Sequence, residues 1–119
     1  MAKHYDLGKK GEQTAINYLL SKDYEIVEKN YRFQKAEIDI IAQKKDTLIC
    51  VEVKTRSTAY FGNPQDFIDK KKIQLLVKAM DYYVIDKDLD VEVRFDIIAI
   101  INQNNEMEIE HIEDAFLYF

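Results

Sequence analysis

The stretch EIDIIAQKKDTLICVEVKT, residues 37–55, contains two runs rich in β-branched residues, separated by a short polar segment at 44–46. Such runs on either side of a polar turn are typical of a β-hairpin. We therefore expect strands at 37–43 and 47–55. Their apolar centres place them near the middle of a sheet that is covered on both faces.

Charged side chains interrupt both strands. Because successive side chains point to opposite faces of a strand, Asp39 is predicted to point away from a face shared by Ile38 and Ile40. By the same rule, Glu52 and Lys54 share one face of the second strand. Two adjacent strands can thus bring one lysine and two carboxylates together on one side of the sheet.

Glu52 follows the apolar run LICV at 48–51, which is typical of a buried strand. Unpaired carboxylates are costly in such a position. Carboxylates that cluster away from water usually bind a metal ion or share a proton. A solvated face or a structural ion cluster is the alternative interpretation of the same residues.

The chemistry that suits this cluster is metal-assisted hydrolysis of a phosphodiester. Asp39 and Glu52 offer the hard oxygen ligands that Mg²⁺ prefers. A bound metal ion lowers the pKa of its water and offsets negative charge on the phosphate, while Lys54 can orient that water. The acid-x-lysine pattern is weak alone, since it recurs at 69–71 in a segment expected to be helical.

Composition limits the class of protein. With 119 residues, of which 47% are apolar, we expect one domain over 1–119. The single cysteine, Cys50, excludes an internal disulfide and is expected to be a buried thiol. No apolar run approaches the ~20 residues that span a bilayer, and the first residues do not resemble a signal peptide. We expect a cytoplasmic protein with no membrane partner.

Charge is distributed unevenly along the chain, although the net charge is −5. Residues 29–78 carry 11 basic and 6 acidic side chains, whereas residues 79–119 carry 2 and 11. A local cationic face can attract a polyanion despite a low net charge. An acidic surface with an ordinary lysine-bearing face is the alternative.

The remaining elements follow from hydrophobic periodicity and turn residues. Asn63 and Pro64 are a suitable N-cap and first residue for the second helix. The expected order is helix 8–22, strands 25–33, 37–43 and 47–55, helix 64–84, and strands 91–102 and 107–112. This order predicts an α/β fold with a sheet flanked by helices.

Several short stretches, spread over nearly the whole chain, match one family. They are GKKGE at 8–12, NYR at 30–32, EID at 37–39, VEVKTR at 51–56, FGNP at 61–64 and RFD at 94–96. On these stretches the chain resembles the YraN-like family of bacterial proteins, within the PD-(D/E)XK nuclease superfamily. The resemblance implies a restriction endonuclease-like three-layer domain with a mixed central sheet, in the order α-β-β-β-α-β-β.

The resemblance also implies roles for individual residues. Asp39, Glu52 and the backbone carbonyl of Val53 would be metal ligands, and Lys54 would assist the attacking water. Glu12, on the first helix, would complete the site as a ligand or as a partner of one. Its alternative role is that of an exposed glutamate near a helix start.

Basic residues near this site are candidates for contact with nucleic acid. Lys72 resembles the helix residue that approaches the scissile phosphate, although it could belong to a solvated helix face. Arg32 and Arg56 flank the site and could instead form surface salt bridges. Arg94 and Asp96 share a strand face and are expected to pair with each other.

We therefore expect a nuclease that depends on Mg²⁺ or Mn²⁺ and acts on DNA. The analogy with archaeal Holliday-junction resolvases favours branched or junction DNA, and a homodimer if two strands are cut. The alternatives are a nucleic-acid-binding module without cleavage activity and a protein-interaction domain that retains the fold.

Overall fold

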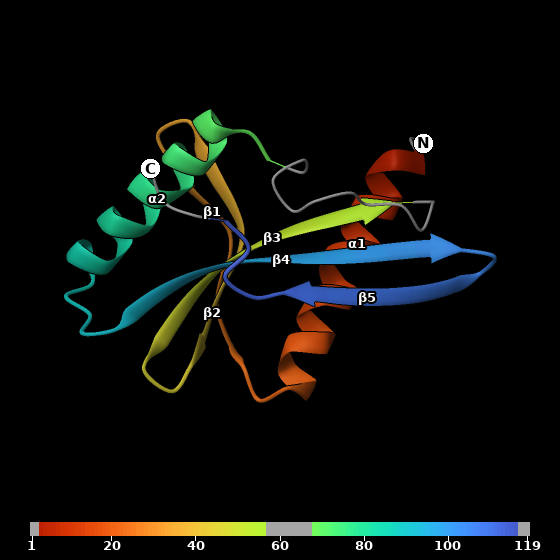
Figure 1. Cartoon of the computed structure of the whole chain (residues 1–119), viewed down its shortest axis with the longest axis horizontal. Helices are drawn as coiled ribbons and strands as arrows, with labels where there is room; N and C mark the ends of the chain where they lie inside the picture. Colours follow the sequence, from red (N-terminus) through yellow and green to blue (C-terminus); the bar gives the residue numbers. More distant parts are fainter. Residues whose placement is uncertain (1–2, 57–67, 117–119) are drawn as a thin grey trace.

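A five-stranded sheet carries one helix on each face in the computed structural model, which describes residues 3–56 and 68–116, with side chains from Lys9 onward (Figure 1). The chain forms an α/β fold, and its elements follow the expected order. They are α1 (Lys3–Ser21), β1 (Glu25–Phe33), β2 (Ala36–Lys44), β3 (Thr47–Arg56), α2 (Lys70–Asp86), β4 (Glu92–Gln103) and β5 (Glu106–Ile112).

The strands lie in the order β1-β2-β3-β4-β5, so that each strand pairs with its neighbours in sequence. All pairs are antiparallel except β3 and β4, which run parallel from Thr47↔Glu92 to Arg56↔Ile101. Parallel neighbours need a crossover connection, and here the segment between them contains α2. The sheet is therefore mixed, as expected, and the expected hairpin turn lies between β2 and β3.

The two helices cover opposite faces of the sheet. Figure 1 shows α1 passing behind β3, β4 and β5, where Ala15 and Leu19 are buried. These two residues are one helical turn apart and thus face the sheet together. On the other face, α2 packs through Ile73, Leu76, Ala79, Met80 and Tyr83.

Each side of the sheet contributes its own apolar cluster. On the α1 side the strands contribute Ile40, Ala42, Ile49, Val51, Ile98 and Ile100. On the α2 side they contribute Ile38, Ile41, Leu48, Cys50, Phe95 and Ile97. The expectation of a buried thiol at Cys50 is confirmed, and burial raises the pKa of this thiol well above its ordinary value.

The second helix begins at Lys70 in the described part of the chain. Asp69 is its N-cap, because its Oδ1 accepts a hydrogen bond of 2.8 Å from the backbone N–H of Lys72. The start expected at Pro64, with Asn63 as cap, lies outside the described residues. Leu75, on the same helix, is half-buried and packs against the core cluster under α2.

The prediction that Ile38 and Ile40 share one face of their strand is wrong. Ile38 packs with the cluster under α2, and Ile40 packs with the cluster under α1. The change of face occurs at Asp39, opposite Asn30, whose φ is 53°. The ladder pairs the residues before and after this position but skips it. Asparagine tolerates this left-handed conformation, and the local kink re-aims the strand.

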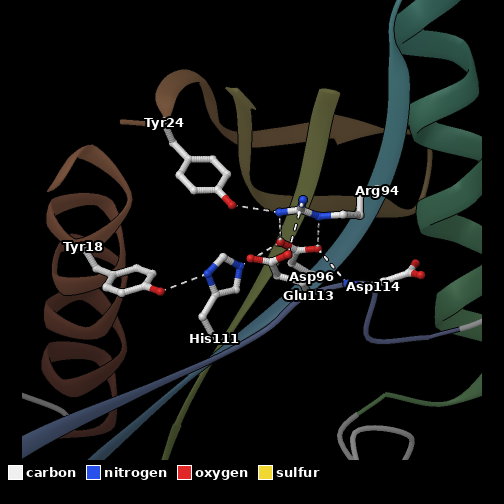
Figure 2. A network of polar contacts seen from close by, with 7 residues as sticks. All are labelled: Tyr18, Tyr24, Arg94, Asp96, His111, Glu113 and Asp114. Atoms are coloured by element: carbon white, nitrogen blue, oxygen red, sulfur yellow. Dashed lines mark hydrogen bonds and ion pairs between the residues drawn. The ribbon is translucent and has the colours of Figure 1, made fainter. Parts of the chain in front are cut away.

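A buried polar network joins α1, β5 and Tyr24, which directly precedes β1, to β4 (Figure 2). Asp96 is fully buried and accepts two hydrogen bonds from Arg94, which also donates to the hydroxyl of Tyr24. The expected internal pairing of Arg94 and Asp96 is therefore confirmed. His111 Nε2 lies 2.7 Å from the same carboxylate, and His111 Nδ1 lies 3.1 Å from the hydroxyl of Tyr18.

Candidate functional site

Asp39 lies where β2 and β3 separate. The ladder between these strands ends at the pair Ile40↔Val51. Beyond that point the backbone N–H of Val53 donates to Asp39 Oδ2 at 2.9 Å, so a side chain replaces the usual backbone acceptor. The kink at Asp39 thus opens the sheet locally and holds one carboxylate oxygen between the two strands. The second oxygen of this carboxylate makes no such bond to β3.

Glu52 contributes the second carboxylate, from the middle of β3. Glu52 is only 3% exposed. Its Oε2 accepts a hydrogen bond of 2.5 Å from the Nζ of Lys72. The Nζ of Lys54 lies 3.6 Å from the same oxygen. The two lysines reach Glu52 from different elements, α2 and β3, and together they compensate a buried negative charge.

Glu12 approaches from the opposite face, on α1. Its neighbour Gly11 lies so close to β3 that a Cβ there would stand 2.2 Å from Thr55 Oγ1. Only glycine permits this approach, so Gly11 sets how closely α1 packs near the end of β3.

Burial and neighbouring negative charges raise the pKa values of Asp39 and Glu12. Burial raises the pKa of Asp39, and the nearby charge of Glu52 raises it further, to about 7, despite the opposing effects of the Val53 N–H and Lys72. Burial also raises the pKa of Glu12, and the charges of Glu37 and Glu52 raise it further. The fold therefore gathers negative charge that is only partly compensated.

The donor set fits a hard divalent cation. Asp39 and Glu52 offer carboxylate oxygens, and the carbonyl of Val53 belongs to the same strand end. The raised pKa of Asp39 reports a repulsion that a divalent cation would relieve. Among the described residues, however, no group of three or more His, Cys, Asp or Glu side chains is arranged to hold a metal ion.

A pocket of about 420 Å³ adjoins Asp39 on the α2 side of the sheet. It lies between the β1–β2 turn and the first turns of α2. Its wall combines the apolar side chains of Ala36, Leu75 and Leu76 with charged side chains of both signs. The site is thus not confined to two carboxylates but opens into a space with room for a small organic group.

The structure brings together most of the residues predicted from sequence. Lys72 was expected to approach a phosphate, but in the structure it binds Glu52 directly. Sequence gave no sign of this contact, since Lys72 lies 20 residues further along the chain. Arg32 forms an exposed pair with Glu37 at 3.6 Å, which is the surface salt bridge named as its alternative. Arg56 donates to the carbonyl of Thr55.

No helix among the described residues is both long and apolar enough to cross a membrane. The protein is thus an α/β protein with a partly buried acidic site where β2 and β3 separate.

Comparison with known proteins identifies the family. The model of the Uncharacterised protein family UPF0102 matches residues 11–100, and the chain belongs to this family. A UPF0102 protein of Christiangramia forsetii is 64% identical over 119 residues, with both chains covered in full. One from Flavobacterium psychrophilum is 60% identical over 119 residues, again with full coverage of both. One from Phocaeicola vulgatus is 43% identical over 116 residues, which is 98% of this chain and 96% of its own.

Proposed function

We propose that this protein is a nuclease of the PD-(D/E)XK type that hydrolyses phosphodiester bonds in DNA with Mg²⁺ or Mn²⁺. The observation that carries the proposal is that Asp39 and Glu52 lie close enough for their charges to interact where β2 and β3 separate, with two lysines beside Glu52. The sheet order and the element order are compatible with a restriction endonuclease-like domain. A cytoplasmic location and a homodimer belong to the same proposal.

Each side chain of the site has its own role in this proposal. Asp39, Glu52 and the carbonyl of Val53 would hold the metal ion, which when bound makes its water acidic and neutralises charge on the phosphate. Lys54, half-buried beside Glu52, orients the attacking water. Lys72 is on the open side of the site, where it can exchange its contact with Glu52 for a phosphate oxygen. Glu12 adds negative charge from the α1 side.

A DNA-binding module without cleavage is the second candidate. The contact between Lys72 and Glu52 favours it, because an ammonium group already neutralises this carboxylate without a metal ion. The two functions share the same surface but differ in one chemical step. A cleavage assay therefore distinguishes the two functions, whereas a binding assay does not.

The decisive experiment is cleavage of a flapped or branched DNA with Mg²⁺ or Mn²⁺, with EDTA as the negative condition. Glu52→Gln and Lys54→Met each keep the shape of the side chain but remove its charge. Each is expected to lower the rate on the order of 100-fold or more, because a charge that stabilises the transition state is lost.

Glu110→Gln is the matched control, since it removes an exposed carboxylate from β5, and it should cleave at the wild-type rate. Equal activity in all four proteins would identify a contaminating nuclease. No activity in any of them, together with DNA binding, would leave the binding module as the function.

A further inference from the structure

The pocket beside Asp39 has the composition of a site for a flat apolar group with a nearby anion. Ala36, Leu75 and Leu76 contribute its apolar lining, and its charged lining combines three lysines with three carboxylates: Lys35, Lys71, Lys72, Glu37, Asp39 and Asp69. Its volume of about 420 Å³ falls in the range of small-ligand pockets. A nucleobase with its phosphate has this combination of surfaces.

The pocket continues along α2 as a stripe of side chains. Lys71, Leu75, Lys78 and Tyr82 are spaced by four, three and four residues, so they lie on one side of the helix. We call these four residues the α2 stripe. Lys71, Lys78 and Tyr82 are exposed, and cationic side chains alternate with an apolar and an aromatic one.

Tyr82 is an unusual surface residue. It is 44% exposed, and its ring stacks on that of Phe33 from β1, with centroids 4.4 Å apart and planes inclined by 21°. This contact orients the ring and leaves part of it accessible. An oriented, accessible aromatic ring is a platform on which a base can stack.

The alternation of cations and apolar surface distinguishes between two forms of DNA. A duplex presents phosphates outside and hides the faces of its bases, so cations alone suffice to bind its backbone. An unpaired strand exposes both its phosphates and the faces of its bases. Leu75 and Tyr82 offer apolar contacts that only an unpaired strand can use.

We propose that the α2 stripe binds an unpaired DNA strand, with one nucleotide entering the pocket next to Asp39; this inference rests on the nuclease function proposed above. The strand follows α2 for ~10 Å between Leu75 and Tyr82, given a rise of 1.5 Å per residue. The phosphates pair with Lys71 and Lys78, and a base stacks on Tyr82. The substrate class is therefore DNA with a single-stranded segment at the cleavage site.

The test is binding of a fluorescent single-stranded oligonucleotide and of a blunt duplex of the same sequence, measured by anisotropy in EDTA, where no cleavage interferes. Wild-type protein is expected to bind the single strand more tightly. Tyr82→Ala should weaken single-strand binding roughly tenfold by removing one stacking contact, whereas Tyr82→Phe should restore it. The melting temperature of each variant reports whether its fold is intact.

Lys78→Ala should flatten the slope of log K against log salt by up to ~0.7, the value for one phosphate on a single strand. Lys45→Ala, in the exposed turn between β2 and β3, is the control and should leave the slope unchanged. Equal affinity for duplex and single strand, or unchanged binding by both Tyr82→Ala and Lys78→Ala, would overturn the inference. Neither result bears on the nuclease proposal, which is decided by metal-dependent cleavage and by Glu52→Gln.

Discussion

Asp39 carries a carboxylate that the fold holds between the end of a strand ladder and a second acidic side chain. Its pKa is raised from 3.8 to about 7, first by burial and then by Glu52. A carboxyl group with a raised pKa in the folded state binds its proton more tightly there than in the unfolded chain. Its contribution to stability is therefore complete below pH ~4 and is lost as the pH rises toward 7.

Asp39→Asn removes this dependence of stability on pH. It should stabilise the metal-free protein at pH 8 by about 1–2 kcal/mol, a value reduced to account for the partial exposure of Asp39 and the favourable charge of Lys72. The amide oxygen of asparagine can still accept the hydrogen bond from Val53. Denaturant unfolding in EDTA at pH 4.5 and pH 8 measures the difference. The gain should nearly vanish at the lower pH; a gain of the same size at both would mean that removal of charge repulsion is not its cause.

At the scale of elements, the network around Asp96 attaches three segments to the parallel strand β4. Burial raises the pKa of this carboxyl group, but hydrogen bonds from His111, Arg94 and the backbone N–H of Asp114 outweigh burial and hold the pKa below its ordinary value. An ionised carboxylate only accepts hydrogen bonds, so His111 carries a proton on Nε2 and donates it to Asp96; when the ring is neutral, its Nδ1 accepts from Tyr18. Every buried side-chain polar atom among the described residues has a partner, which marks the network as structural.

Asp96→Asn should therefore destabilise the protein on the order of 2–3 kcal/mol near neutral pH, because it removes acceptors from Arg94 and His111. The effect has the opposite pH dependence to that of Asp39. A lowered pKa contributes stability above pH ~4, and that contribution is lost as the pH falls through the folded-state pKa. Thermal melts of wild type, Asp96→Asn and the exposed control Glu110→Gln from pH 3 to 7 test it. A deficit that does not shrink toward pH 3 would contradict this assignment.

At the scale of the whole molecule, periodicity predicted the order of the elements because most of them bury a continuous apolar face. Periodicity failed to assign the faces of Ile38 and Ile40. A strand that is covered on both faces has apolar residues on both, so its sequence does not alternate between apolar and polar residues. Asn30 was the only local signal of the kink. The pair Asp39 and Glu52 was predictable from two adjacent strands, whereas the contact between Lys72 and Glu52 depends on how α2 crosses the sheet, which no local pattern encodes.

Metal binding should be visible as a property of the whole fold. An ion that binds only the folded protein adds ~2.7 kcal/mol at a hundredfold excess over its Kd, or about 10 °C in melting temperature for a domain of this size. Wild type should gain this from Mn²⁺, and Asp39→Asn should lose the gain. Lys72→Met should show a larger gain, because the lysine Nζ on Glu52 competes with the ion for the same oxygen.

The three proteins and Glu110→Gln should be melted in EDTA and over a range of Mn²⁺ concentrations. Without metal, Lys72→Met should melt lowest, since Glu52 is then compensated only by Lys54 at 3.6 Å. With Mn²⁺ it should recover more than wild type does, while Glu110→Gln follows wild type throughout. An identical response of all four proteins would place any metal binding elsewhere on the surface, and Asp39 and Glu52 would then hold no ion.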